Sequence, residues 1–388
     1  MCNMKHLFPL SVLGLALVST FASGNGLGRV FKPSPALNTE LPKPSGSFVV
    51  GTVIYNWTDV TRDDIVTEAP NDKRQITVQL WYPSQSEQGA QRAPYMPELT
   101  VLRSAFKQGA DQFEKVQTNS FLQTKLSNSQ HKYPVIIFSH GMGVPRSWYT
   151  MLMEELASHG YIVAGIDHPY MGLVAMNGKV VKPYPRWTEP PAGGLANATD
   201  EVRDKYWRPG FEQLSADQRF TLDQLTKLNS QDPDRRFTRR LDLKHVGMMG
   251  HSMGFVSETC GVDLRFTACL NLEGVPEMNE RRNGFRQPYM TMRDGDDSPR
   301  MTTIYSATRN VAYDVLIKGA GHNSYQDSLL AAGYKYKLDV SRGHQIIDAY
   351  MLAFFNTYLK GKKSELLDNA SQAFAEVELK VYRPAREK

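Results

Sequence analysis

Short runs of apolar residues recur along the chain, separated by longer and more polar segments. Uninterrupted apolar runs of about five residues are typical of strands buried on both faces of a parallel sheet. Two further segments, residues 48–55 and 75–82, are rich in β-branched and aromatic side chains and predict strands joined by a charged hairpin segment. The apolar runs predict buried strands at residues 134–138, 161–166, 246–249, 267–272, 288–292 and 313–317, with 313–317 as the last strand of the sheet.

Two segments show the spacing of an amphipathic helix. In residues 148–158 the apolar side chains fall on one face, and Gly160 follows as a stop signal. Residues 345–359 have the same spacing and end before Gly361. Because buried strands alternate with helices, the pattern predicts an α/β protein with one doubly wound, mostly parallel sheet.

Residues 173–240 interrupt this alternation with clustered prolines and a charged helical segment at about 215–228. We interpret them as an insertion between the strands before the turn at 250–254, packed over one edge of the sheet. A lid over the site and plain filler fit the insertion equally well. The folded domain is expected to span residues 47–382, after a flexible lead-in at 25–46, and residues 85–130 give no clear elements.

The first 24 residues have the pattern of a secretory signal. A weakly positive start precedes an apolar run at residues 7–21, and small residues follow at 22–24. The run of 15 residues is shorter than the roughly 17–25 that cross a bilayer, so we expect cleavage instead of anchoring. The mature protein is therefore predicted to be secreted, either extracellular or periplasmic.

The amino-acid composition agrees with the prediction of an ordinary folded domain. Hydrophobic residues make up 41% and charged residues 22% of the chain, as in ordinary globular proteins. The net charge of +5 is small, and the basic doublets are scattered, without the dense basic blocks of a nucleic-acid arm. We therefore expect no nucleic-acid partner, and nothing in the chain points to a protein partner.

Two cysteines, Cys260 and Cys269, remain after removal of the signal. In a secreted chain they could pair, but two buried free thiols fit the apolar surroundings equally well. The chain has no Cys-x-x-Cys pair and no His and Glu cluster at metal-ligand spacing. We therefore expect no metal and no cofactor.

The stretch Gly250-His251-Ser252-Met253-Gly254 directly follows the apolar run at 246–249. It has the G-x-S-x-G spacing of the nucleophile turn of α/β-hydrolases. In that turn the strand and helix backbones approach closely, so the flanking positions must be small. Because the spacing also occurs by chance in Gly-rich turns, the rest of the chain must supply the partners of Ser252.

A serine hydroxyl becomes a nucleophile when a base removes its proton, and imidazole suits this task near neutral pH. His322 follows the apolar run at 313–317 in a glycine-flanked loop, in the chain order of α/β-hydrolases. His344 also lies downstream, but it opens a helix instead of ending a strand. We therefore favour His322 as the base.

The acid that orients the imidazole has two possible positions. Glu273 ends the strand that directly follows the serine turn, and Asp296 and Asp297 end the next strand. Both positions lie at carboxyl ends of strands, where open α/β sheets place their sites. Spacing alone favours Asp296 or Asp297.

The segment His140-Gly141-Met142-Gly143 ends another buried strand and brings small residues beside the site. The backbone N–H groups of Met142 and Met253 are expected to face a developing oxyanion. His140 and His251 are interpreted as structural hydrogen-bonding groups. His168, at a further strand end, is expected either to border the substrate pocket or to be structural.

With these motifs in place, the chain resembles the single-chain, plasma-type platelet-activating factor acetylhydrolases and their microbial relatives. The resemblance covers about residues 48–360, and the insertion matches poorly. Besides the serine turn, it rests on Leu80-Trp81-Tyr82-Pro83-Ser84-Gln85, Phe138-Ser139-His140-Gly141-Met142-Gly143, Leu156-Ala157-Ser158-His159-Gly160-Tyr161-Ile162-Val163-Ala164, Arg265-Phe266, Leu272-Glu273 and Lys318-Gly319-Ala320-Gly321-His322.

The resemblance implies an α/β-hydrolase fold and a secreted, metal-independent serine esterase. It moves the acid to Glu273, with Glu in place of the family's usual Asp, and it assigns the oxyanion donors to Met142 and Met253. The implied substrate is a phospholipid with a short sn-2 acyl group such as acetyl, reached by peripheral contact with a lipid interface. The alternatives are a general short-chain carboxylesterase or polyester hydrolase and, in another class, an inactive hydrolase-fold binding protein.

Overall fold

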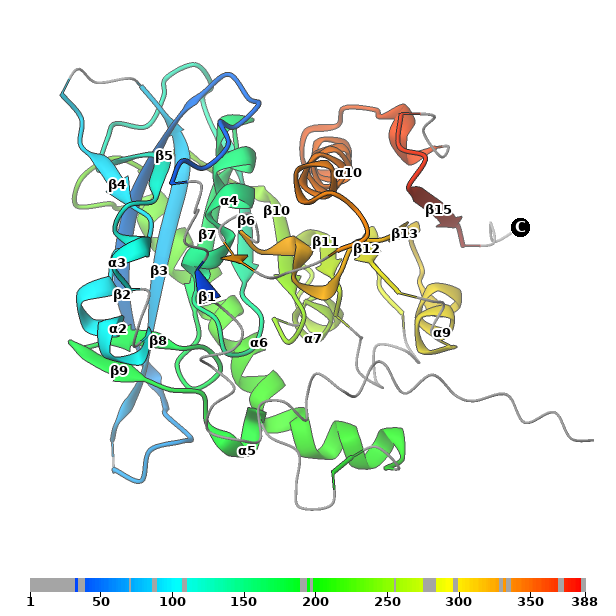
Figure 1. Cartoon of the computed structure of the whole chain (residues 1–388), viewed down its shortest axis with the longest axis horizontal. Helices are drawn as coiled ribbons and strands as arrows, with labels where there is room; N and C mark the ends of the chain where they lie inside the picture. Colours follow the sequence, from blue (N-terminus) through cyan, green and yellow to red (C-terminus); the bar gives the residue numbers. More distant parts are fainter. Residues whose placement is uncertain are drawn as a thin grey trace, which may run out of the picture.

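Eleven hydrogen-bonded strands form one continuous sheet in this computed structural model (Figure 1). The structure describes residues 32–33, 39–69, 71–85, 89–106, 110–188, 194–195, 198–254, 256–274, 284–295, 299–327, 331–332, 336–368 and 373–384. The predicted signal at 1–24 and most of the lead-in therefore lie outside the described residues. In spatial order the strands are β15 (Val377–Tyr382), β13 (Ala312–Ile317), β12 (Tyr289–Arg293), β11 (Phe266–Leu272), β10 (Leu241–His251), β6 (Tyr133–Ser139), β7 (Ile162–Asp167), β3 (Lys73–Ser84), β2 (Val49–Asp63), β5 (Gln117–Leu122) and β4 (Arg92–Pro94).

The centre of the sheet is parallel, as the apolar runs predict. Neighbouring strands from β7 through β6, β10, β11 and β12 to β13 all pair in parallel. Every residue of β6, β7 and β12 is buried, which explains why these segments are mostly apolar in sequence. The expected α/β-hydrolase fold, with a mostly parallel sheet between helices, is confirmed.

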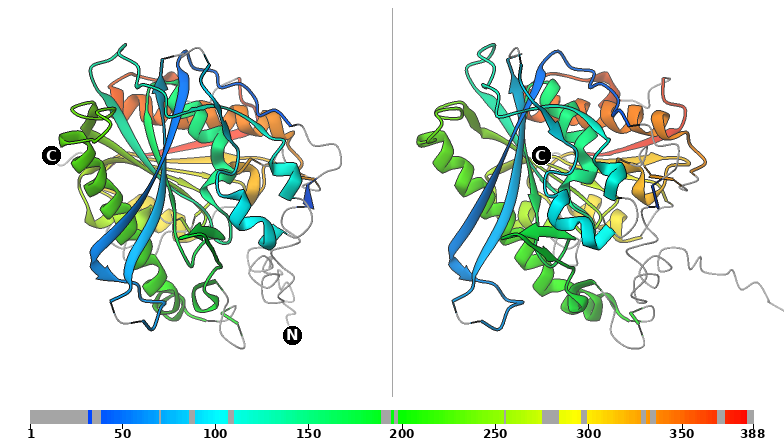
Figure 2. Two further views of the ribbon diagram at one scale, coloured as in Figure 1. Left: turned by 90° about the vertical axis from the view of Figure 1, so that its left-hand side faces the viewer. Right: turned by 60° about the vertical axis from the view of Figure 1, so that its left-hand side comes forward.

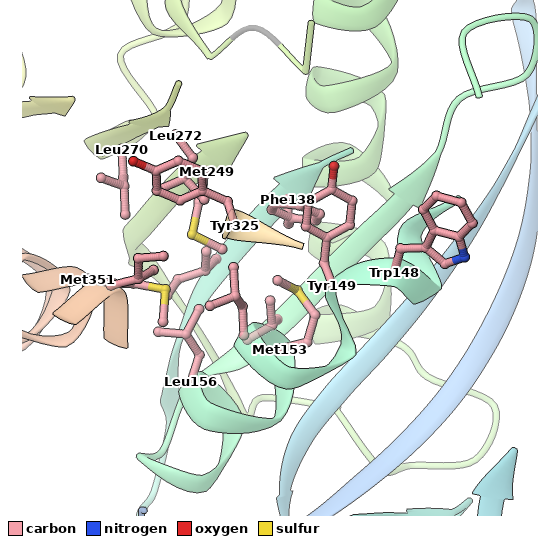
Figure 3. Close-up of a cluster of buried hydrophobic side chains, with 14 of the residues drawn as sticks. Phe138, Trp148, Tyr149, Met153, Leu156, Met249, Leu270, Leu272, Tyr325 and Met351 are labelled. Carbon is pink, nitrogen blue, oxygen red and sulfur yellow. The ribbon is translucent and has the colours of Figure 1, made fainter. Parts of the chain in front are cut away.

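Helices cover both faces of the sheet, and each face has its own apolar core. On one face lie α4 (Thr150–Ser158) and α10 (Val340–Lys360), whose apolar residues pack against alternate positions of the strands (Figure 1). Figure 3 shows this core, in which side chains of α4 meet Phe138, Met249 and Met351. On the other face lie α6 (Asp200–Ser230), α7 (Ser257–Val262) and α9 (Pro299–Ala307).

The antiparallel strands at both edges of the sheet differ from the prediction. The expected hairpin is present, but β2 and β3 are longer than predicted and run side by side over most of their length (Figure 2). Residues 85–130 contain β4, β5 and the helices α2 (Leu99–Phe106) and α3 (Ala110–Phe113). The prediction that 313–317 is the last strand is wrong, because β15 pairs antiparallel with β13 at the edge. Only one residue of β15 is fully buried, so it lacks the apolar run that marks the central strands.

The segment at 173–240 also lies differently from the prediction. It begins with the small hairpin of β8 (Val174–Met176) and β9 (Lys179–Val181), followed by α5 (Pro185–Thr188) and the long α6. Leu222, Leu225 and Leu228 of α6 pack into the core beneath β6, β7 and β10. The second half of α6 is therefore the crossover helix between β7 and β10 on a face of the sheet, not an insertion at its edge.

Cys260 of α7 and Cys269 of β11 form a disulfide, with a Cα–Cα distance of 6.6 Å. This settles the open alternative between a pair and two free thiols. The bond ties the first helix after the serine turn to the neighbouring strand. A search of the described part of the chain finds no helix with the length and apolar character of a membrane span.

Candidate active site

Ser252 lies directly after β10, in a backbone conformation that side chains rarely adopt. Its φ is +54°, in the left-handed region, and its N–H donates to the carbonyl oxygen of Leu272 at 2.8 Å. A Cβ on Gly250 would lie 2.3 Å from the carbonyl oxygen of Gly254, so only glycine allows this close approach. The turn therefore has the strained geometry that the G-x-S-x-G spacing predicts.

His322 meets Ser252 across the carboxyl end of the sheet. The histidine opens the short 3-10 helix η3 (His322–Tyr325) after β13, and its Nε2 lies 2.9 Å from the Oγ of Ser252. Burial lowers the pKa of His322 below its ordinary value, and the nearby charge of Asp294 offsets part of this effect. A neutral imidazole beside the hydroxyl is the protonation state that a general base needs. His344 is instead buried in α10.

Two carboxyl groups lie together at the ends of the next two strands. Glu273 follows β11, and its carboxylate accepts a hydrogen bond from the backbone N–H of Asp294 at 2.7 Å. Burial, and then the charge and hydrogen bond of the Asp294 side chain, raise the pKa of Glu273 well above its ordinary value. Because the charge of Asp294 also acts on His322, these three side chains form one electrostatic unit.

Sequence reasoning missed Asp294, although it considered the acidic segment that Asp294 opens. Asp296 and Asp297 lie outside the described residues. The signal available was position, because Asp294 directly follows β12 while the other two stand further along the loop.

The backbone amides of Met142 and Met253 lie in two tight loops beside Ser252. The loops are held by hydrogen bonds from Gly143 N–H to the Met171 carbonyl at 2.9 Å and from Gly254 N–H to the His251 carbonyl at 2.7 Å. Within the part of the chain that the structure describes, no hydrogen bond from the N–H of Met142 or Met253 is found. Two amide donors beside a serine hydroxyl are what the binding of an oxyanion requires.

An apolar cluster borders the same two loops. The partly buried side chains of Met142 and Met253 pack against residues of the 173–240 segment and its surroundings. The other members are Val66, Tyr170, Met171, Tyr184, Trp187, Trp207, Phe211 and Leu214. We call this group the aromatic wall, and it gives the site an apolar side next to the two amide donors.

His168, which was considered as a substrate contact, lies inside the fold instead. Its ring is fully buried between the hydroxyl of Ser139, 2.9 Å from Nε2, and the carboxylate of Asp217, 3.0 Å from Nδ1. His140 is also buried, and its Nε2 accepts the backbone N–H of His168 at 3.0 Å. Both histidines are therefore structural links behind the site, as expected for His140.

Across the described ranges, no group of three or more His, Cys, Asp or Glu side chains is arranged to hold a metal ion.

The chain is similar to known acetylhydrolases and to a known esterase. Residues 35–174, which include the loop of Met142 but end before the serine turn, match the family model for platelet-activating factor acetylhydrolase, isoform II. A platelet-activating factor acetylhydrolase of Cavia porcellus is 25% identical over 370 residues, covering 83% of this chain and 78% of that protein. A probable 1-alkyl-2-acetylglycerophosphocholine esterase of Arthroderma benhamiae is 25% identical over 388 residues, covering 87% of this chain and 92% of that protein.

Among solved structures, a ferulic acid esterase from Streptomyces cinnamoneus superimposes with a TM-score of 0.72 at 24% identity. The superposition covers 88% of this chain and 99% of the esterase. The likeness concerns the fold.

Proposed function

We propose that this chain, which is similar over most of its length to platelet-activating factor acetylhydrolases, is a serine ester hydrolase that removes short acyl groups from phospholipids. The observation that carries the proposal is the contact of 2.9 Å between Ser252 Oγ and His322 Nε2. A hydroxyl and a neutral imidazole at this distance form a nucleophile with its base.

In the proposed reaction, His322 takes the hydroxyl proton while Ser252 Oγ attacks the ester carbonyl carbon. The amides of Met142 and Met253 bind the negative oxygen of the tetrahedral intermediate, and each such donor contributes about 10²–10³ in rate. The imidazolium then gives its proton to the leaving alcohol. Water, activated by the same imidazole, releases the acid from the acyl-enzyme.

The carboxylate that orients His322 is proposed to be that of Glu273, which is hydrogen-bonded to Asp294. The carboxylate of Glu273 is held in place by the backbone N–H of Asp294, and the charge of Asp294 in turn acts on His322. In this proposal the carboxylate of Glu273 orients the imidazole and stabilises its protonated form.

Variants of the two carboxyls test this assignment. Glu273→Gln keeps the shape of the side chain and should lower kcat more than Asp294→Asn does. A larger loss in the Asp294 variant would reassign the orienting acid to Asp294.

The substrate class is proposed from two observations. The relatives are named for acetyl phospholipid hydrolysis, and the aromatic wall offers an apolar surface beside the two amide donors. A general short-chain carboxylesterase or polyester hydrolase is the second candidate, favoured by the partly buried Tyr184 and Trp207, whose rings can pack against an aromatic acyl group.

A hydrolysis panel separates these candidates. The full chain and its Ser252→Ala variant are assayed on an acetyl phospholipid, p-nitrophenyl esters of increasing chain length, and an aromatic polyester. We expect hydrolysis of acetyl phospholipid that falls as the sn-2 acyl chain lengthens. Preference for long acyl chains or for the polyester would overturn the acetylhydrolase assignment. No organophosphate labelling of Ser252 would instead make the chain an inactive binding protein.

Secretion is proposed as well. It is supported by the signal-like pattern of residues 1–24 and by the Cys260–Cys269 disulfide, since disulfides persist mainly in oxidising compartments. Expression with the natural N-terminus should yield an exported protein that has lost about 24 residues by intact mass. A full-length product retained in the cytoplasm would contradict this.

A further inference from the structure

His251, the residue before the nucleophile, has no part in the mechanism above, yet its ring is buried and held on both sides. Its Nδ1 lies 2.7 Å from the hydroxyl of Tyr149, and its Nε2 lies 2.8 Å from the backbone carbonyl oxygen of His322. Tyr149 is also fully buried, and its hydroxyl oxygen lies 3.0 Å from the backbone nitrogen of Gly141.

The donors and acceptors in this series of hydrogen bonds can be assigned in only one way. The carbonyl oxygen of His322 can only accept, so Nε2 of His251 carries the proton and donates it. Nδ1 of His251 then has a lone pair and accepts the hydroxyl proton of Tyr149, and the hydroxyl oxygen accepts the N–H of Gly141. Burial, and then the neighbouring His322, hold the pKa of His251 well below its ordinary value, so the ring stays neutral and keeps this arrangement.

This series of hydrogen bonds connects residues that neighbour, or are, the groups that the proposed reaction uses. Gly141 precedes the oxyanion donor Met142, His251 precedes the nucleophile Ser252, and the carbonyl belongs to the base His322 itself. These groups come from the loops after β6, β10 and β13. A Cβ on Gly141 would lie 2.9 Å from Nδ1 of His251 and 3.1 Å from the hydroxyl of Tyr149, so these three residues are packed too closely for a larger side chain at position 141.

We propose that Tyr149 and His251 are positioning residues, which lock the oxyanion loop and the His322 loop in register with Ser252. This inference rests on the proposed esterase function. A buried relay suits the task because its hydrogen bonds are shielded from water and set both the distance and the angle of each loop. Catalysis is sensitive to such placement, since an error of about 1 Å can cost about 10²-fold in rate.

The ring of Tyr149 also packs in the core beside that of Phe138 (Figure 3), and the two ring centroids lie 4.7 Å apart. Tyr149→Phe therefore keeps the packing and removes only the hydroxyl. Tyr133→Phe is the matched control. Tyr133 is also fully buried and donates its hydroxyl to the Ser127 carbonyl at 3.0 Å, but it lies at the opposite end of β6, about 20 Å from the site.

Steady-state kinetics on a short-chain p-nitrophenyl ester, with thermal unfolding in parallel, test the proposal. Both variants lose a buried hydrogen bond and should lose similar thermal stability. Only Tyr149→Phe should lose roughly 10- to 100-fold in kcat, with KM within about twofold. Equal kcat in the two variants would refute the positioning role while leaving the esterase function intact; a wild-type protein without esterase activity would instead refute the function.

Substitution of His251 gives a second measurement that does not depend on Tyr149→Phe folding well. His251→Gln can still place an amide donor near the Nε2 position, whereas His251→Leu cannot. We expect His251→Gln to recover a substantial part of the kcat that His251→Leu loses. The double variant Tyr149→Phe with His251→Leu should lose no more than His251→Leu alone, because one relay is broken in both. Additive losses, or no recovery with Gln, would refute the relay.

Discussion

Replacement of Asp217 by Asn should destabilise this fold strongly, because Asp217 is the centre of a buried charge network. Its carboxylate lies on α6, 2.7 Å from Nη2 and 3.2 Å from Nε of Arg74 on β3. It also lies 2.9 Å from Arg62 Nη2 and 3.0 Å from His168 Nδ1. The network joins the crossover helix to the hairpin and to the histidine behind the oxyanion loop.

The size of the expected loss in stability follows from the burial of the ion pair. The side chains of Asp217 and Arg74 are 0% and 1% exposed, so little solvent screening weakens their interaction. Removing one partner of a buried ion pair costs about 3–5 kcal/mol, mainly because the other charge is left uncompensated. Asp64 remains 2.9 Å from Arg74, which places the expected loss at the lower end, about 3 kcal/mol. At about 1.2 °C per kcal/mol for a chain of this size, Tm should fall by about 4 °C.

The effect should also depend on pH. Burial alone would raise the pKa of Asp217, but the charge of Arg74 and the hydrogen bonds of His168 and Arg74 lower it below its ordinary value. A depressed pKa in the folded state stabilises the fold at pH above the unfolded pKa of about 3.9, and this contribution is lost as the pH falls further. The difference between wild type and Asp217→Asn should therefore be full at pH 7 and shrink below about pH 4.

The assay is urea and thermal unfolding at pH 7, with Asp223→Asn as the matched control on the same helix. Asp223 pairs with Arg265 at 2.5 Å, but both side chains are about half exposed, and such pairs contribute only about 0–1 kcal/mol. If Asp217→Asn proved no more destabilising than Asp223→Asn, the reasoning from burial would be refuted.

Three further outcomes are expected. The acid limb of the pH profile of kcat/KM should have its midpoint below pH 6.5, because burial lowers the pKa of His322; a midpoint near 7 or above would contradict that environment. Replacing Cys260 and Cys269 by Ala should cost about 3 kcal/mol, since the bond closes a loop of separation 9; an unchanged Tm would count against this. Gly254→Ala should abolish activity, because its Cβ would lie 2.4 Å from a backbone oxygen at the end of β6, whereas Gly343→Ala in α10 meets only ordinary contacts and should retain it.

The local pattern of the chain was sufficient to predict the central strands and the residues that end them. Strands buried on both faces are mostly apolar, so β6, the second half of β10 and β11 through β13 could be predicted from short apolar runs. The serine turn could be predicted because its tight backbone geometry requires two glycines within five residues. His322 is visible because a parallel sheet brings the carboxyl ends of its strands to one edge.

Only the tertiary structure decided which groups meet across that edge. The pairing of Glu273 with Asp294, the link from Tyr149 through His251 to His322, and the place of α6 on a face of the sheet join residues far apart in the chain. Patterns of hydrophobicity report whether a position is buried, but not which neighbour it is buried against. Buried polar groups are placed by the partners that satisfy them, and those partners are assembled only when the sheet and its helices pack.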